Sequence, residues 1–168
     1  STANAANLPI TPDGTTNTKI SAAANGVPIV NIAAPNSGGL SHNKFTNYNV
    51  NSQGLIINNA ANNTNGIIST KIGGIITDNP NLSNSASVIL NEVTSNNVTK
   101  INGYTEIAGS KADLIIANPN GISMSGAGFI NVSRLTAIVG SSNQTNPNPN
   151  NLTFSLSQSS DGFLPELT

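Results

Sequence analysis

Cysteine is absent from the 168 residues of the chain. Its absence excludes a disulfide framework and any metal site built from thiolates. It is compatible with the cytosol, and equally with the many bacterial surface proteins that cross membranes unfolded. The first residues, Ser1-Thr2-Ala3-Asn4-Ala5, do not form a signal peptide, but a mature chain would look the same after an export signal had been removed.

Charge is scarce as well. Charged residues make up 8% of the chain, against ~25% in typical proteins, and the formal net charge is −1. Binding of nucleic acid or an anionic membrane needs clustered Lys and Arg, and the six basic residues are scattered. We therefore expect no nucleic-acid partner. No apolar run approaches the ~18 residues that a membrane-spanning helix needs.

Histidine occurs once, as His42 in the segment Ser41-His42-Asn43-Lys44. A nucleophile and its base must meet in space and need a third group that orients the base, so a Ser next to a His in sequence is not such a pair. All its neighbours are polar, which predicts a solvated loop.

What the chain does contain is short apolar runs rich in Ile and Val, separated by clusters of Asn, Gly, Ser and Pro. Asn alone occupies roughly 30 positions. Helical periodicity is almost missing, and such runs between turn residues are typical of β-strands. The chain should therefore fold as an all-β sandwich, barrel or solenoid. The expected strands are Val27–Ile32, Phe45–Val50, Leu55–Ile57, Ile67–Ile68, Ile75–Ile76, Val88–Val93, Tyr104–Ala108, Leu114–Ala117, Ile122–Met124 and Phe129–Val139.

Two repeats favour a solenoid. The segment Leu55-Ile56-Ile57-Asn58-Asn59 resembles Leu114-Ile115-Ile116-Ala117-Asn118. In addition, apolar residues with a charged residue before them recur every 21 residues, a length suited to one coil of a parallel β-helix. In such a stack, Asn side chains at equivalent positions could hydrogen-bond from coil to coil. The alternative is that Asn only marks loops and a weakly charged surface. The four repeated pairs are Lys71-Ile72, Glu92-Val93, Asp113-Leu114 and Arg134-Leu135.

Acidic residues are few and dispersed. Glycoside hydrolysis needs two carboxylates facing one bond, and lyases built on β-helices hold Ca²⁺ through grouped carboxylates. Only Glu92 and Asp113, one expected coil apart, have a spacing that would bring two acids together. They would form either a small site or part of a surface charge ladder with Lys71 and Arg134. We expect no enzyme, no cofactor and no metal.

The two ends of the chain differ from its middle. Residues 1–35 contain one clear strand and are expected to cap the open end of the solenoid, whose unpaired edges need cover. Residues 36–140 are expected to form the coils and extra-helical strands. Residues 141–151 hold alternate prolines and read as a loop, and residues 152–168 as a final strand and tail.

Asn-Pro-Asn occurs twice between apolar runs, as Asn79-Pro80-Asn81-Leu82 and as Asn118-Pro119-Asn120-Gly121-Ile122. In this order and separation the pair resembles the N-terminal secretion domain of bacterial two-partner secretion exoproteins, a family of filamentous haemagglutinin-like adhesins, haemolysins and contact-dependent growth inhibition toxins. The resemblance covers most of residues 27–140. It also rests on Asn31–Asn36, Gly39–Phe45, Gly54–Asn59 and Gly128–Asn131.

The resemblance implies that residues 1–168 are a single secretion domain, folded as a right-handed parallel β-helix with an N-terminal cap and extra-helical strands. It implies Sec export to the periplasm of a Gram-negative bacterium. There the domain would be recognised by an outer-membrane transporter, a β-barrel with POTRA domains, and the exoprotein would reach the cell surface or the medium. The domain would act as a monomer and seed β-helix folding of a longer adhesin or growth-inhibition toxin.

Two hypotheses remain open for the Asn-Pro-Asn motifs. The second satisfies the preferences of a type I turn, with Asn first, Pro second and Gly fourth, so each motif could act through the corner that it builds. Alternatively, the transporter contacts the motifs directly. Another function class is also open, an adhesive or carbohydrate-binding β-helix. Exposed aromatic residues would favour it, but the chain has only Tyr48, Tyr104 and four Phe.

Overall fold

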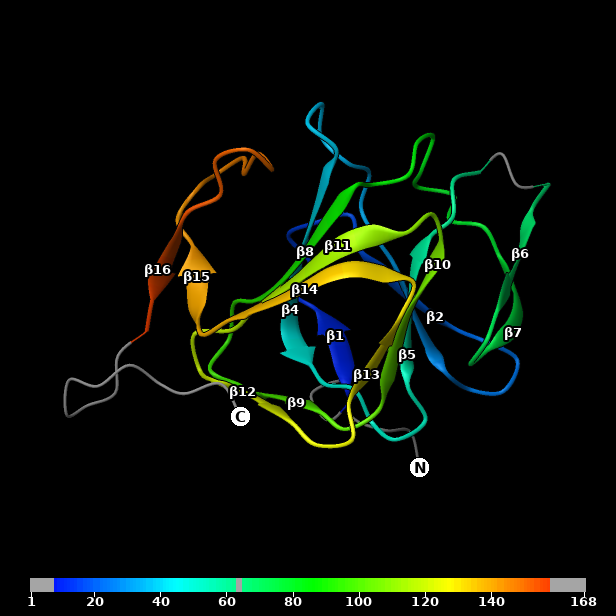
Figure 1. Cartoon of the computed structure of the whole chain (residues 1–168), viewed down its shortest axis with the longest axis horizontal. Coiled ribbons are helices and arrows are strands. Elements are labelled where there is room, and N and C mark those ends of the chain that lie inside the picture. Colours follow the sequence, from blue (N-terminus) through cyan, green and yellow to red (C-terminus); the bar gives the residue numbers. More distant parts are fainter. Residues whose placement is uncertain (1–7, 63–64, 158–168) are drawn as a thin grey trace.

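The computed structural model describes residues 8–62 and 65–157. These residues form sixteen β-strands and no helix (Figure 1), so none of them lies in a helix that could cross a membrane. The all-β prediction is confirmed. The predicted tail beyond residue 157 and the first seven residues of the predicted cap lie outside the described residues.

The strands are β1 (Ile10–Pro12), β2 (Lys19–Ala22), β3 (Pro28–Asn31), β4 (Leu40–Tyr48), β5 (Leu55–Asn59), β6 (Ile67–Thr70), β7 (Gly74–Thr77), β8 (Val88–Val93), β9 (Thr99–Ile101), β10 (Tyr104–Gly109), β11 (Ala112–Ala117), β12 (Ile122–Met124), β13 (Gly128–Ile130), β14 (Val132–Ile138), β15 (Gly140–Ser142) and β16 (Phe154–Leu156).

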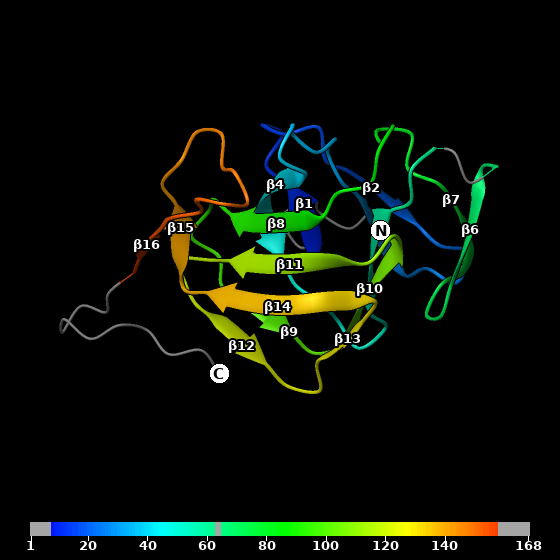
Figure 2. The same cartoon turned by 45° about the horizontal axis from the view of Figure 1, so that its top comes forward.

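The strands wind into a parallel β-helix with three faces. The first face contains β4, β8, β11 and β14, which run parallel (Figure 2). The second face contains β3, β5, β10 and β13, which are also parallel to one another. The third face is the parallel pair β9–β12, extended by a bridge from Val50 to Ile101. Following the chain gives four coils: β3–β4, β5–β8–β9, β10–β11–β12 and β13–β14. The predicted solenoid is therefore confirmed, and right-handed crossovers are the rule for parallel strands.

Aliphatic rows fill the inside of the coils. On the second face Val30, Ile57 and Ile107 are aligned in successive coils, and each is at most 1% exposed. On the third face Val50 and Ile101 line up in the same way and are equally buried. Because each coil supplies one residue to each row, a coil without a neighbour leaves its row exposed, and stability comes from stacking.

Two hairpins outside the helix cover parts of its outer surface. The antiparallel pair β6–β7 packs Ile76 over Ile56 on the second face. The pair β15–β16 and the loop that joins its two strands place Leu152 and Phe154 against the outer side of the first face. These covers explain why β5 and β11 contain the consecutive apolar residues Leu55–Ile57 and Leu114–Ala117 rather than an alternating pattern, since both sides of these segments are buried.

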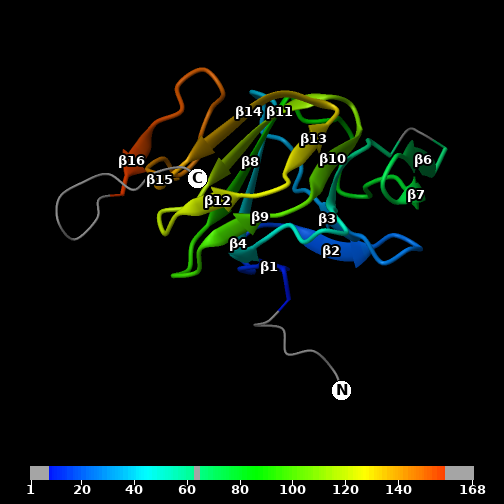
Figure 3. The ribbon, with the colours of Figure 1, turned by 60° about the horizontal axis from the view of Figure 1, so that its bottom comes forward.

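The N-terminal residues pair antiparallel with the first coil. Strand β1 lies along β4, and β2 lies along β3, so each borders its sheet on the side away from the later coils (Figure 3). At the other end β12, β13 and β14 are the last strands of the three faces. Their inward side chains Met124, Phe129 and Leu135 are only partly buried against the core.

The 21-residue register is correct for one step only. Asp113 and Leu114 do align with Arg134 and Leu135. However, Asp113 lies opposite Val88, not Glu92, and Lys71 and Ile72 lie in the turn between β6 and β7. The predicted approach of Glu92 and Asp113 is therefore wrong.

Candidate functional site: two Asn-Pro-Asn corners

The first corner, Asn79–Leu82, joins the β6–β7 hairpin to β8. Its backbone closes a turn, because the Leu82 N–H donates to the Asn79 carbonyl at 3.1 Å. The Asn79 side chain stiffens this turn by accepting a hydrogen bond from the Asn81 N–H at 2.9 Å. An Asn that bonds the backbone two residues on is a turn device in its own right.

The amide group of Asn79 points into the molecule. Its Nδ2 donates to the carbonyls of Ile32 and Asn58, each at 3.0 Å, and the residue is 0% exposed. Nδ2 of Asn81 reaches the same Ile32 carbonyl at 3.2 Å. Ile32 follows β3, so two asparagines of the second coil hold one carbonyl of the first.

The second corner, Asn118–Ile122, joins β11 to β12 and repeats this arrangement. The Gly121 N–H donates to the Asn118 carbonyl at 3.3 Å, and Asn118 Oδ1 accepts from the Asn120 N–H at 2.9 Å. Nδ2 of Asn118 donates to the Asn97 carbonyl at 2.9 Å, and Nδ2 of Asn120 reaches that carbonyl at 3.2 Å.

Asn118 also donates to Thr99 Oγ1 at 2.8 Å, and it is 0% exposed. Asn97 and Thr99 belong to the second coil, whereas Asn118 and Asn120 belong to the third. Each Asn-Pro-Asn corner therefore fastens its own coil to the coil before it.

The remaining motif residues divide into a buried and a surface set. Leu82 and Ile122, at 0% and 3% exposure, are part of the core. Pro80 is exposed. Half-buried positions are taken by Asn81, Pro119, Asn120 and Gly121.

The two corners are not one continuous surface. Asn79–Leu82 precedes a strand of the first face, β8, whereas Asn118 directly follows its neighbour β11. They therefore lie at opposite ends of this face, roughly one strand length or about 20 Å apart. A single compact binding surface therefore does not include both corners.

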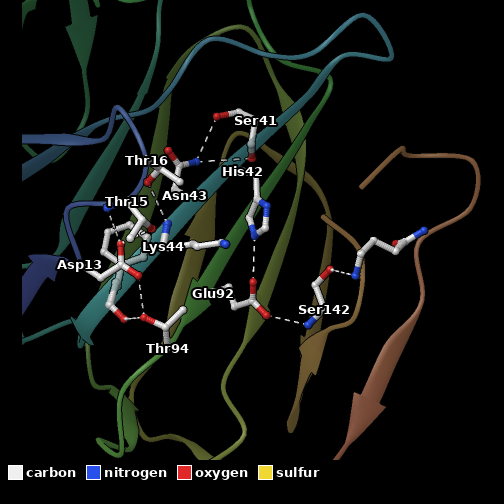
Figure 4. Close-up of polar contacts among 12 residues, drawn as sticks. Asp13, Thr15, Thr16, Ser41, His42, Asn43, Lys44, Glu92, Thr94 and Ser142 are labelled. Carbon is white, nitrogen blue, oxygen red and sulfur yellow. Dashed lines mark hydrogen bonds and ion pairs between the residues drawn. The ribbon is translucent and has the colours of Figure 1, made fainter. Parts of the chain in front are cut away.

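His42 is not on a solvated loop, as its polar neighbours predicted, but on β4. Its Nε2 lies 2.8 Å from Oε1 of Glu92, and the two side chains are 14% and 6% exposed. The second oxygen of Glu92 accepts the Ser142 N–H of β15 at 2.6 Å (Figure 4). Glu92 thus ties the β15–β16 hairpin to the first face, and its partners are His42 and the Ser142 N–H rather than Asp113, which lies opposite Val88.

A second buried carboxylate, Glu106 on β10, holds the other hairpin. It accepts the N–H groups of Lys71 and Ile72 at 2.9 Å, which lie at the tip of the β6–β7 turn. Sequence reasoning missed both anchoring roles. The available signal was an acid inside an otherwise apolar strand, since a buried carboxylate must find donors.

Asp13 fastens β1. It accepts hydrogen bonds from the Thr15 N–H and hydroxyl and from the Thr94 hydroxyl (Figure 4). Partial burial raises the pKa of Asp13, but these hydrogen bonds, with help from Lys44, outweigh it and leave the pKa below its ordinary value. Inside the coils, burial raises the pKa of Tyr48 to about 12.

In residues 8–62 and 65–157, no three His, Asp or Glu side chains lie close enough together to hold a metal ion. The ordered features of the corners are coil-to-coil hydrogen bonds, and both buried glutamates are occupied by backbone donors. These observations define a structural solenoid domain whose corners are built from asparagine.

The chain belongs to the family of TPS secretion domains, whose model matches residues 8–164. A crystal structure of the filamentous hemagglutinin secretion domain matches with a TM-score of 0.74 and 44% identity, covering 83% of this chain and 45% of that one. The two-partner secretion system to which such domains belong includes an outer-membrane transporter.

Sequence comparison with characterised proteins gives relatives of the same kind. The chain is 51% identical over 133 residues to the 16S rRNA endonuclease CdiA of Enterobacter cloacae, covering 78% of this chain and 4% of that protein. It is 52% identical over 120 residues to the tRNA nuclease CdiA of Escherichia coli (strain STEC_O31), covering 70% and 4%. It is 50% identical over 123 residues to the filamentous hemagglutinin of Bordetella pertussis, covering 73% and 3%.

These relatives are secreted or cell-surface proteins of Gram-negative bacteria. This chain spans only 3–4% of their length. The nuclease named in the CdiA relatives is carried by a different region of those proteins.

Proposed function

We propose that this domain is the export signal of a much longer exoprotein, an adhesin or a contact-dependent growth inhibition toxin, and that it has no catalytic role of its own. In this proposal the Sec machinery delivers the chain to the periplasm. The POTRA domains of the partner β-barrel bind it there as an extended chain, and it folds outside. Membership in the TPS family supports the general role.

The observation that carries the proposal is the direction of the corner contacts. Asn79 reaches back to Ile32 of the first coil, and Asn118 reaches back to Asn97 of the second. A chain that emerges N-terminus first would therefore find the acceptor already in place when each corner arrives. Parallel coils suit this order, because each contacts mainly its neighbours.

In this proposal the motif residues Asn79, Pro80, Asn81 and Leu82, and Asn118, Pro119, Asn120, Gly121 and Ile122, act mainly through the folded corners. Burial supports a role in the folded domain, where Asn79 and Asn118 are 0% exposed and donate hydrogen bonds to the preceding coil. Direct reading by the transporter would require the unfolded chain or the exposed Pro80.

We also propose a division of labour along the chain. Within the expected cap, residues 1–35, strands β1 and β2 border the first coil, whereas β3 is already a strand of that coil. Residues 36–140 hold the other strands of the coils. The open strands β12, β13 and β14 would accept the next coil of the exoprotein. Their half-buried Met124, Phe129 and Leu135 support this seeding role, since a further coil would cover them.

A cross-link between coils tests whether export requires an unfolded chain. Asp113, which is half-buried, and Arg134, which is exposed, are aligned in neighbouring parallel strands, a separation of about 4.8 Å that suits a disulfide. The variant D113C/R134C, oxidised in the periplasm, should be retained there and released by a reductant. The single variant D113C is the control. Equal export of the oxidised double variant would contradict the proposal.

The adhesive alternative based on exposed aromatics receives little support. Tyr48 is 1% exposed inside the coils, and Tyr104 is 54% exposed on β10. Phe45 is buried, and Phe129 and Phe154 are half-buried. The described residues thus present no ladder of rings.

A further inference from the structure

A polar groove of about 580 Å³ runs along the third face, between its outer surface and residues 8–9. Amide side chains dominate it. Its lining includes Leu8, Asn51, Asn96, Val98, Lys100 and Asn102. It borders the second Asn-Pro-Asn corner, because Asn97 of its lining accepts hydrogen bonds from Asn118 and Asn120 through its carbonyl. The side chains of Asn51, Asn96, Lys100 and Asn102 take no part in those corner contacts or in the hairpin anchors.

The solenoid places these groups in rungs. Inward-facing Val50 pairs with Ile101 of the next coil, so the residues that flank them, Asn51 and Asn102, face outward in neighbouring coils. Parallel strands set such rungs about 4.8 Å apart. That interval is close to the length of one sugar residue in an extended oligosaccharide, so successive rungs can meet successive sugars.

Some amide side chains of the groove are fixed by hydrogen bonds, and others are not. Nδ2 of Asn97 donates to Asn47 Oδ1 at 2.6 Å, and Asn49 Oδ1 accepts the Lys100 N–H at 2.9 Å. In contrast, the side chains of Asn51, Asn96 and Asn102 form no hydrogen bond within the part of the chain that the structure describes. A free amide offers two donors and an acceptor, which matches the paired hydroxyls of a sugar.

Two further features narrow the ligand. Val98 and Leu8, 46% and 42% exposed, offer apolar contact to the C–H faces of a sugar ring. Lys100 is the one charged residue of the lining, and the sole ion pair among the described residues is between His42 and Glu92. The ammonium group is therefore available to a carboxylate.

We propose that this groove binds an extended acidic oligosaccharide of the uronate class. Asn51 and Asn102 hydrogen-bond the hydroxyls of neighbouring sugars, Val98 contacts a ring face, and Lys100 pairs with a sugar carboxylate. The contact is independent of the transporter, so it would serve the domain after export.

An NMR titration of the isotope-labelled domain tests this proposal, with tetragalacturonate as the acidic probe and cellotetraose as the neutral one. Tetragalacturonate should shift the side-chain amide signals of Asn51 and Asn102 and the Val98 methyl signals in a saturable way. K100M should weaken the binding of tetragalacturonate at least 3-fold, and N102A should weaken the binding of both probes. The control N84A changes an exposed Asn outside the groove.

Absence of saturable shifts with both probes would overturn the proposal, as would shifts that do not centre on the groove. Equal affinity for both probes, unchanged by K100M, would overturn the acidic class. Secretion of K100M and N102A at the level of the parent domain is expected, because neither residue belongs to a corner. A loss of secretion in both would contradict a role separate from export.

Discussion

Replacing Asn79 by Asp keeps the shape of the side chain and removes both amide hydrogens. The Nδ2 group, which donates to the carbonyls of Ile32 and Asn58, becomes a second carboxylate oxygen that faces two acceptors. The bond from the Asn81 N–H survives. The change therefore isolates the coil-to-coil contact from the turn.

The cost follows from these contacts. Two donated hydrogen bonds contribute about 1 kcal/mol each, and leaving buried acceptors unpaired adds about 1–3 kcal/mol. Because one oxygen of the new carboxylate is buried facing two carbonyl acceptors, and only the Asn81 N–H remains as a donor to the group, the total should reach about 3–5 kcal/mol. Domains of this size are stable by about 5–15 kcal/mol, so N79D should lose a large part of its stability.

Urea unfolding followed by circular dichroism measures this loss. N79D should shift the midpoint by at least 1 M for a slope of about 1–3 kcal/mol per M, whereas P80A, at the exposed position of the same turn, should stay within about 1 kcal/mol. An N79D midpoint equal to that of the unsubstituted domain would refute the claim that this amide joins the coils.

Four further substitutions test other positions. E106Q should release the β6–β7 turn, costing about 1–3 kcal/mol, with faster hydrogen exchange at the Lys71 amide. G109A should cost more than 2 kcal/mol, roughly twice a simple left-handed penalty, because a Cβ would lie 2.6 Å from the Ala60 Cα at φ +84°. G26A, at φ +90° with open space, should cost only about 1 kcal/mol. Folding lowers the pKa of Asp13, so the stabilisation by its carboxylate is present above the unfolded pKa and is lost as the pH falls through the folded pKa. In D13N the free energy of unfolding, measured by urea denaturation at a series of acidic pH values, should therefore fall less steeply with decreasing pH.

Sequence reasoning found the strands because β-branched runs between turn residues are a local signal. The 21-residue spacing correctly aligned Leu114 with Leu135. It wrongly placed Glu92 beside Asp113, because the coils differ in length. The step from β8 to β11 is longer than 21 residues, with Asp113 opposite Val88, and the β6–β7 hairpin interrupts the second coil. Corner loops can lengthen without changing the strands, so a fixed period cannot give the register.

The role of asparagine was only partly predictable. Side-chain hydrogen bonds between asparagines of neighbouring coils exist as expected, from Asn58 Nδ2 to Asn31 Oδ1 at 3.0 Å and from Asn97 Nδ2 to Asn47 Oδ1 at 2.6 Å. Asn79 and Asn118 instead donate to backbone carbonyls of an earlier coil. Any residue type can supply such a carbonyl, so the sequence identifies the corner motifs but carries no mark of their partners.

The same limit applied to His42. Its polar neighbours suggested a loop, yet β4 alternates buried and half-buried polar residues such as Ser41 and Asn43. Asn43 accepts the Thr18 hydroxyl and the Ala33 N–H. Polar residues that satisfy one another inside a stack cannot be told from surface residues by hydropathy alone.

The central claim is that the Asn-Pro-Asn corners serve secretion through the fold. The direct measurement is secretion of N118A by the partner transporter, compared with L114A, a core substitution in the same coil expected to cost about 2–5 kcal/mol. Both variants are also measured for stability. If the corners act through the fold, secretion of both variants should fall with their stability along one common line. A fully folded N118A that is not secreted, beside a destabilised L114A that is, would contradict it.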